Sequence, residues 1–209
     1  MIITIFGATT SLGQQLVKQA LHMGHHVKAY GRYIVTAPLP ENEKLELVEG
    51  TLFDDSKLLR AIKGCDAVIT ALEGGTAGVD KTRSLGMKKI IVQMEKANVK
   101  RIVALGDRSL LHTADGKMIL EGEDFPLHDQ PVANEHLDAF NSLKASSLNW
   151  TVVCAPKILE AEPTGLYRTS VNTAPVPDHE RIGTGDLAMC MLNEVSKNEF
   201  VNKKLGISN

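Results

Sequence analysis

The sequence is poor in aromatic residues, and it carries no excess of charge of either sign. Aromatic side chains make up 4% of the 209 residues, and 23 Lys and Arg stand against 25 Asp and Glu. Because nucleic-acid binding needs a basic surface, we expect no nucleic-acid partner. No apolar run approaches the roughly 20 residues of a membrane span, so we expect no membrane contact. The apolar run at the amino terminus is short and has no basic residues before it, unlike a secretory signal peptide.

Cysteine is also scarce, and its placement argues against both disulfides and metal binding. Cys65, Cys154 and Cys190 are an odd, scattered set, and no two have the spacing of a metal-binding pair. They are typical of reduced core residues in a cytoplasmic protein, which is the location we expect. Of the seven histidines, His22, His25 and His26 cluster at the end of a predicted helix, where a solvated patch explains them. We therefore predict no metal site.

The informative stretch is the first 21 residues, which read as a strand, a glycine turn and a helix. The apolar residues 2–6 predict a buried parallel strand, and leucines and valine at helical spacing follow from Leu12 to Leu21. Gly7 would permit the tight turn, and Gly13 would permit close packing of the helix on the strand. The helix N-terminus offers free N–H groups and partial positive charge, which suit a pyrophosphate. An ordinary strand-to-helix turn without a ligand is the alternative.

The rest of the chain alternates strands and helices, which predicts an α/β fold with a doubly wound parallel sheet. With no repeat and no low-complexity linker, we expect one domain over residues 1–209. From about residue 156 several prolines interrupt the alternation, and we expect this small irregular part to shape the substrate side.

Strands are predicted at residues 2–6, 27–30, 45–48, 67–71, 101–105, 150–154 and 203–207, and later helices at 56–62, 80–97, 134–146 and 186–195. Ser56 and Thr184 are the expected caps of their helices, Leu85 is expected inside, and Gly78 is expected in a flexible loop after the fourth strand.

Three positions bear on which cofactor would bind. Sites for NAD place a carboxylate at the end of the second strand, but this chain has Arg32 there, and a guanidinium attracts a 2′-phosphate. NADP(H) is therefore preferred over NAD(H), with a solvated loop charge as the alternative. Asp54 lies where a carboxylate can accept from an adenine amino group, although Asp is also common in the turn before a helix. The segment from Leu72 to Gly75, which follows the fourth strand and includes Gly74, is expected near the nicotinamide side of the pyrophosphate.

The catalytic possibilities are limited by a missing pair of residues. No tyrosine precedes a lysine by four positions, because Phe140 occupies the position before Lys144 that would need the tyrosine. Alcohol–ketone chemistry through a tyrosinate is therefore unfavoured. Reduction of a flavin needs mainly that two rings be stacked at reactive distance, against walls such as Leu110, Leu111 and Tyr167. His112 and His136 are candidate acids, with a surface or helix-face position as the alternative for each.

Together these segments resemble the atypical short-chain dehydrogenases of the NAD(P)H-binding, NmrA-like group, which have a Rossmann-like fold, and most of all the flavin and biliverdin-IXβ reductases. The resemblance covers nearly the whole chain. It rests on Gly7-Ala-Thr with Gly13, on Arg32, on Gly50 to Asp54, on Ala155-Pro156 and on Thr164-Gly-x-Tyr167. It implies three groups of cofactor contacts: Gly7, Thr9, Ser11, Leu12 and Gly13 for the pyrophosphate, Arg32 and Asp54 for the 2′-phosphate and adenine, and Pro156, Lys157 and Ile158 near the nicotinamide.

Two positions depart from that group. Thr10 replaces its second glycine, so a Cβ crowds the phosphate while the hydroxyls of Thr9, Thr10 and Ser11 could add contacts. Asp107 stands where these reductases commonly carry serine, and it could pair with Arg108 or donate a proton if burial raised its pKa.

Three functional hypotheses follow. The first is an NADPH-dependent reductase whose acceptor is a free flavin, bound as a substrate, or a similar conjugated molecule. The second is a redox sensor that binds NADP(H) without catalysis and acts through a protein partner. The third, an epimerase or isomerase acting on a nucleotide sugar, is weakened by the missing Tyr–Lys pair.

Overall fold

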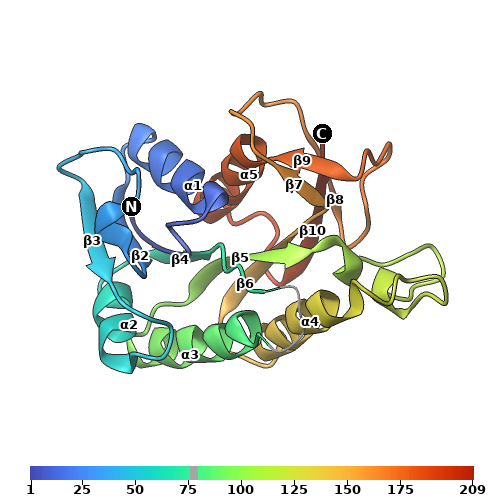
Figure 1. Ribbon diagram of the computed structural model, residues 1–209, viewed down its shortest axis with the longest axis horizontal. Helices are drawn as coiled ribbons and strands as arrows, with labels where there is room; N and C mark the ends of the chain where they lie inside the picture. The colour runs from blue at the N-terminus through green and yellow to red at the C-terminus, as the bar shows by residue number, and fades with distance from the viewer. Residues whose placement is uncertain (76–79) are drawn as a thin grey trace.

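The fold is built on one eight-stranded sheet. The computed structural model describes residues 1–75 and 80–209, so Gly78 lies outside the described residues. The strand order is β3-β2-β1-β4-β5-β6-β10-β8, and all neighbours are parallel except β8, which runs antiparallel to β10. In that order the strands are Leu45–Glu49, His26–Gly31, Ile2–Phe6, Ala67–Thr70, Arg101–Asp107, Asn149–Ala155, Lys203–Ser208 and Arg168–Val171. The predicted doubly wound, Rossmann-like sheet is confirmed (Figure 1).

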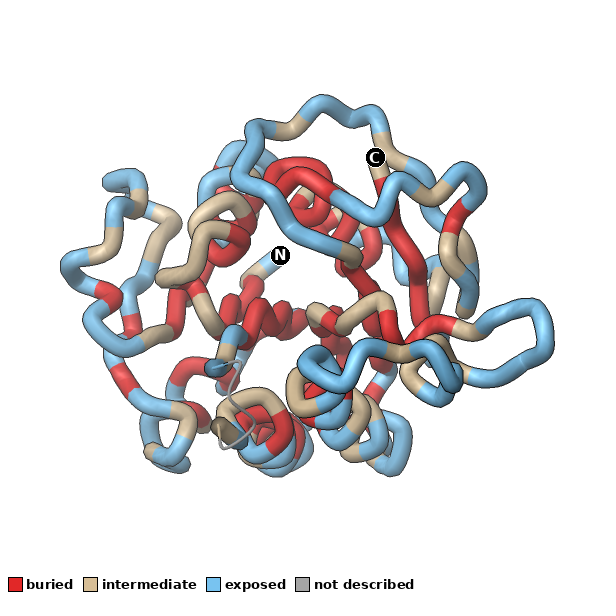
Figure 2. Tube along the Cα trace, turned by 45° about the vertical axis from the view of Figure 1, so that its right-hand side comes forward, coloured by how far each residue is buried: buried red, intermediate tan, exposed pale blue. Residues whose placement is uncertain are grey.

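Helices cover both faces of the sheet. The helices α1 (Ser11–His22) and α5 (Thr184–Lys197) pack on one face, and α2 (Asp55–Ile62), α3 (Thr82–Lys96) and α4 (Gln130–Lys144) pack on the other (Figure 1). Each face has its own apolar core, because side chains of a strand alternate between the two faces. In β1, Ile3 and Ile5 belong to the first core, whereas Phe6 belongs to the second. Buried residues accordingly concentrate in the strands and on the inward faces of the helices (Figure 2).

The direction of winding reverses between β1 and β4, and this reversal determines where a ligand can bind. Strands β2 and β3 extend the sheet on one side of β1, whereas β4, β5 and β6 extend it on the other. The connections that leave the carboxyl ends of β1 and β4 therefore diverge and open a crevice between them, which is the usual ligand site of such sheets.

The part of the chain after β6 completes the sheet and adds to one end of it. Strand β10 lies between β6 and β8, while β7 (Lys157–Leu159) and β9 (Arg181–Gly183) form a separate two-stranded parallel sheet. The sequence predicts the strand at 203–207, whereas it does not predict β7, β8 or β9. Short 3-10 turns lie at Ile34–Thr36, Arg108–Leu110 and Ile119–Glu121.

Three local predictions are wrong. Leu85 is 42% exposed, because it lies on the outer side of α3 while Ile90, Ile91 and Met94 face the core. Asp54, and not Ser56, caps α2 by accepting from the Lys57 N–H. Thr184 is the first residue of α5 and not its cap, since its hydroxyl bonds to the backbone of Ala161.

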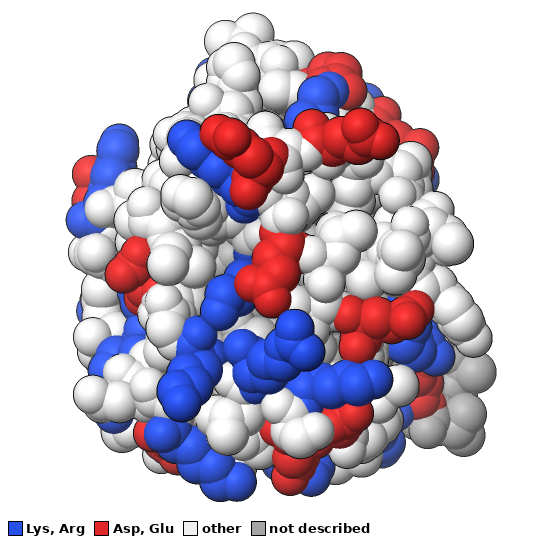
Figure 3. Space-filling view, turned by 90° about the vertical axis from the view of Figure 1, so that its left-hand side faces the viewer, with Lys and Arg blue, Asp and Glu red and all other residues white. Residues whose placement is uncertain are grey.

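Surface charge and cysteines add little to the choice of ligand. On the side where β3 and α2 lie, basic side chains gather with acidic ones among them, and ion pairs such as Arg60–Glu46 and Lys89–Asp55 join them (Figure 3). The three cysteines are buried and free of disulfides. In residues 1–75 and 80–209, no helix combines the length and the apolarity that crossing a bilayer requires.

Candidate functional site

The turn between β1 and α1 has the tight geometry that its glycines predict. Gly7 has a φ of +81°, and a Cβ on it would lie 2.2 Å from the carbonyl oxygen of Ala71, directly after β4. A Cβ on Gly13 would lie 2.0 Å from the carbonyl oxygen of Gly7. Neither position accepts a larger residue without moving backbone, so both glycines are needed to bring the start of α1 into the crevice.

The hydroxyls of this turn are already engaged in part. Thr10 caps α1, since its Oγ1 accepts from the Gly13 N–H at 3.0 Å and donates to the Gly7 carbonyl at 3.0 Å. The side chain that replaces the usual glycine is therefore part of the turn's own hydrogen bonding. Ser11 donates its hydroxyl to Glu160. Leu12 is buried in the core, where it can only support the turn.

Beside this turn lies a cavity of about 400 Å³, in the crevice at the carboxyl ends of β1, β2 and β4. Five residues predicted to bind cofactor line it: Gly7, Thr9, Thr10, Arg32 and Leu72. Glu73, which belongs to the segment 72–75 predicted near the pyrophosphate, also lines it. Seven further lining residues were not predicted, namely Tyr30, Gly31, Gly50, Thr51, Leu52, Phe53 and Thr82. Ser11, Gly13, Asp54, Gly74, Pro156 and Lys157 are absent from its lining.

Tyr30 and Phe53 give this cavity an aromatic component. Tyr30 is buried against Phe6, with ring centroids 5.0 Å apart, and its hydroxyl donates to the Thr51 carbonyl. Burial and the nearby charge of Asp54 raise the pKa of Tyr30 to about 12, so its hydroxyl stays protonated. Phe53 is 60% exposed although it is large and apolar. The sequence does contain a signal for this aromatic surface, because Phe53 is an apolar residue in the polar turn after β3.

Arg32 lies at the junction of two cavities. It lines the 400 Å³ cavity and also a neighbouring one of about 380 Å³, which Thr9, Tyr33, Thr36, Ala37 and Pro38 border. The residue is exposed, and no hydrogen bond or ion pair joins it to another part of the described chain. Its guanidinium can therefore meet an anionic ligand without first breaking an ion pair.

Asp54 has a structural task next to this cavity. Its Oδ1 accepts from the Ser56 hydroxyl at 2.7 Å and from the Lys57 N–H at 3.1 Å. These bonds, the one from Ser56 first, lower the pKa of the carboxyl group, so it is ionised at neutral pH. The predicted contact with adenine stays a prediction, but the capping of α2 is sufficient to explain an aspartate at this position.

The connection after β4 is held by charged groups. Arg83 donates to the Gly74 carbonyl at 3.1 Å, and Asp80 accepts from the Gly75 N–H at 2.6 Å. This bond is the main reason why the pKa of Asp80 falls to about 2. Partial burial instead raises the pKa of Glu73, whose side chain borders the cavity. The described start of this connection thus places the Glu73 carboxyl group beside the site, while Gly74 is held by Arg83 and Gly75 by Asp80.

The first candidate proton donor, Asp107, has a local structural partner. Asp107 ends β5 and accepts from the Ser109 N–H at 2.8 Å. Of the two roles considered for Asp107, pairing with Arg108 does not occur, since Arg108 pairs with Asp178 at 2.8 Å and with Glu180 at 3.2 Å.

Neither histidine is presented as an acid. The Nε2 of His112 lies 3.2 Å from the ammonium of Lys204, and burial and that charge lower the His112 pKa. His136 is buried on α4, and burial lowers its pKa to about 4 although the charge of Asp107 opposes the shift. The surface position weighed for His136 is therefore wrong, and both rings are neutral at pH 7.

The three residues predicted as substrate walls are also placed elsewhere. Leu110 and Leu111 are buried in the core on the side of α3 and α4, and neither lines the 400 Å³ cavity. Tyr167 lines a different cavity of about 190 Å³, together with residues of α5, and receives a hydrogen bond from Asn193. Pro156 and Lys157 lead into the exposed strand β7.

Comparison with known proteins agrees with this geometry. The model of a family described as NAD(P)H-binding matches residues 7–198. Protein YwnB of Bacillus subtilis is 23% identical over 99% of this chain and 98% of its own length. A Streptococcus pneumoniae protein proposed to be an NADH-flavin reductase has a similar structure, with a TM-score of 0.82, 22% identity, and coverage of 100% of this chain and 99% of that one. A short-chain dehydrogenase/reductase from Veillonella parvula, solved with NADP, has a TM-score of 0.80, 19% identity, and coverage of 100% and 94%. The family model covers most of the chain and includes the glycine turn, Arg32 and the strands around the cavity, and the chain belongs to the NAD(P)H-binding family.

Proposed function

We propose that the protein is an NADPH-dependent reductase that passes hydride to a free flavin or a similar conjugated acceptor. The observation that carries the proposal is the 400 Å³ cavity between the β1–α1 turn and the β3–α2 connection, with Arg32 at its edge. The structure offers this cavity a glycine cradle, an aromatic side and an unpaired cation, which fit the diphosphate, the adenine and the 2′-phosphate of NADPH.

The residues that would hold the cofactor follow from that arrangement. The Gly7 turn and the start of α1 would bind the diphosphate, and Tyr30 and Phe53 would face the adenosine. Arg32 would bind the 2′-phosphate from the neighbouring cavity that it shares with Thr9 and Tyr33. When bound, the nicotinamide supplies the hydride, so the protein's task is to orient it and the acceptor.

The choice of acceptor is supported by what surrounds the site. The chain has no Tyr-x-x-x-Lys pair, His112 is neutral beside the Lys204 ammonium, and His136 is neutral and buried on α4. An acceptor whose reduction takes its proton from water suits such a site better than a ketone, which needs a positioned acid. Free flavins have this property.

A non-catalytic NADP(H) sensor that acts through a protein partner is the second candidate. Thr10 favours it, because this side chain fills the position nearest the diphosphate and is fixed by two hydrogen bonds. Neither His112 nor His136 is available to donate a proton, and this is equally compatible with a protein that only binds the cofactor.

The experiment that tests the proposal follows NADPH absorbance anaerobically with FMN as acceptor and with an enzyme-free control. Protein-dependent loss of absorbance supports the reductase. If there is no loss with FMN, quinones or tetrapyrroles while NADPH binds tightly, the reductase is rejected in favour of the sensor. If NADPH neither binds nor is oxidised, both candidates fail.

A further inference from the structure

The segment after β7 is fixed to the start of α5 by several backbone contacts. Thr184 and Gly185 both bond to the backbone of Ala161, and a Cβ on Gly185 would lie 2.2 Å from the nitrogen of Pro163. The Asp186 carboxylate accepts from the backbone N–H groups of Thr164 and Gly165 at 2.7 and 2.8 Å. The backbone from Ala161 to Gly165 is thus held in place by the first turn of α5.

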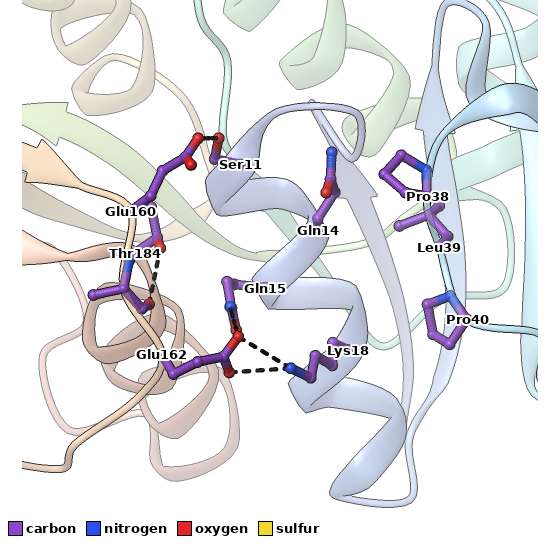
Figure 4. A pocket seen from close by; sticks show the side chains of 11 residues that line it. Ser11, Gln14, Gln15, Lys18, Pro38, Leu39, Pro40, Glu160, Glu162 and Thr184 are labelled. Carbon is purple, nitrogen blue, oxygen red and sulfur yellow. Dashed lines mark hydrogen bonds and ion pairs between the residues drawn. The ribbon is translucent and has the colours of Figure 1, made fainter.

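Two carboxylates extend to α1, one from Glu160 directly before this fixed segment and one from Glu162 within it. Glu160 accepts from the Ser11 hydroxyl at 2.5 Å, at the first residue of the helix. Glu162 accepts from Lys18 at 3.0 Å and from Gln15 at 3.2 Å, further along the same helix. Figure 4 shows the two glutamates on the same side of α1, bordering a trough that has Pro38 and Pro40 on its other side.

Glu160 and the diphosphate of a bound cofactor would need the same end of α1. The helix N-terminus attracts negative charge, and in this structure the Glu160 carboxylate lies within hydrogen-bond distance of its first residue. The Thr10 hydroxyl is used inside the turn, so Ser11 is a hydroxyl that the diphosphate could use once Glu160 has moved away. Two anions so close would repel each other.

We propose that Glu160 competes with the cofactor's diphosphate for Ser11 and the N-terminus of α1, and that it thereby sets the affinity for pyridine nucleotides. This inference rests on the proposed function, because it concerns the same nucleotide site. Binding opens the Ser11–Glu160 hydrogen bond. Since the diphosphate is common to both cofactors, Glu160 weakens NADPH and NADH by the same factor, unlike Arg32, which faces only the 2′-phosphate.

The test is a titration of NADPH and of NADH, followed by nicotinamide fluorescence, into the wild type and the variant Glu160→Gln. The variant keeps the shape of the side chain and removes its charge, and we expect the Kd of both nucleotides to fall by about five- to tenfold. Glu162→Gln is the matched control, since it removes a charge from the same segment further from the helix N-terminus, and its Kd values stay within about twofold of wild type. Because the effect is repulsion between charges, the difference in Kd between the wild type and Glu160→Gln becomes smaller as the salt concentration increases.

The outcomes separate this inference from the proposed function. Unchanged or weaker binding by Glu160→Gln overturns the inference alone, and weaker binding would mean that Glu160 accepts hydrogen bonds from the cofactor. An equal gain in Glu162→Gln also overturns it. If Glu160→Gln binds the nucleotides and the wild type does not, the inference is supported. If neither protein binds them, the inference is rejected together with the proposed function. If Glu160→Gln does not fold, Glu160→Ala gives the same comparison.

Discussion

At the scale of single residues, the proposed preference for NADPH over NADH depends on Arg32. It is exposed at the junction of two cavities, and no carboxylate of the described chain pairs with it. We expect Arg32→Ala to weaken NADPH binding by about 1–3 kcal/mol, because a charge-assisted contact to the 2′-phosphate is lost. NADH lacks that phosphate, so its Kd should change little. Fluorescence titration of both nucleotides measures the difference.

The control for this variant is Arg60→Ala. Its side chain is 77% exposed on α2 and reaches Glu46 only at 4.0 Å. Its loss should leave the Kd of both nucleotides unchanged. Equal weakening of NADPH and NADH by Arg32→Ala would remove the basis for an NADP preference.

His136 makes a second residue-scale prediction, which concerns stability and not binding. Its pKa is about 4 in the folded protein, against 6.5 for a histidine that is not buried. Between these values the unfolded chain binds a proton that the folded chain does not, so stability falls as pH falls from about 6.5 to about 4. At pH 5 this amounts to about 2 kcal/mol.

Urea unfolding at pH 7 and pH 5 measures this effect. The variant His136→Gln should lose about 2 kcal/mol less than the wild type between these two pH values, whatever its stability at pH 7. His128→Gln is the control, because its side chain is 83% exposed, and it should keep the wild-type pH dependence. Parallel behaviour of His136→Gln and the wild type would show that His136 does not stay neutral in the folded state.

At the scale of elements, the start of α1 depends on the Thr10 hydroxyl. That hydroxyl links the Gly13 N–H to the Gly7 carbonyl, so it closes the turn as well as capping the helix. We expect Thr10→Val to cost about 1 kcal/mol of stability, as the loss of an N-cap usually does. In a chain of this size that lowers the melting temperature by about 2–4 °C.

Thr9→Val is the matched control, because the Thr9 side chain lies beside Gly31 and its hydroxyl makes no hydrogen bond to another described residue. A melting temperature for Thr10→Val equal to that of Thr9→Val would contradict the capping role.

Several of the strands that could be predicted from the sequence have residues buried on both faces of the sheet. Strands β1, β4 and β6 read as apolar runs because both of their faces pack under helices. Strand β7 is exposed at all three positions, and β8 at three of its four, so no pattern of burial marked them. Their pairing depends on β9 and β10, which are distant in sequence, and only tertiary structure brings them together.

The same difference, between residues placed by local spacing and residues placed by tertiary contacts, explains which site residues could be predicted from the sequence. Gly7, Thr9 and Arg32 follow from local spacing, because a strand, a turn and a helix place them without help from other segments. Leu110 could not be placed in that way, since the 3-10 turn after β5 directs it into the core. Tyr167 depends on how the segment before β8 packs against α5, which no short-range pattern reveals. Phe53 is the opposite case, because its unusual position is visible in the sequence. It is an apolar residue in a polar turn, and its place in the lining of the cavity explains why it is there.

At the scale of the whole molecule, a buried ion pair joins the first part of the chain to the last. Arg101 at the start of β5 donates to Glu194 of α5 at 2.7 Å, and Thr151 of β6 donates to the same carboxylate oxygen at 2.9 Å. Both charged side chains are less than 10% exposed. The strand β10, from the last part of the chain, lies beside β6 in the same sheet. Such an arrangement predicts that residues 1–155 and 156–209 unfold together.

Replacing Arg101 with Met tests that coupling. The variant leaves the Glu194 carboxylate buried without its cation, so we expect it to lose about 3–5 kcal/mol of stability. In the double variant Arg101→Met, Glu194→Leu neither charge of this pair remains, so no unpaired carboxylate is left at this place and most of that loss should be recovered. Trp150 on β6 is the one tryptophan of the chain, so its fluorescence reports on the sheet beside β10, while circular dichroism reports on all helices. If the chain is one domain, both signals shift to lower urea together in Arg101→Met. Two separate transitions would instead mean that the carboxyl-terminal part unfolds on its own and that the single-domain prediction is wrong.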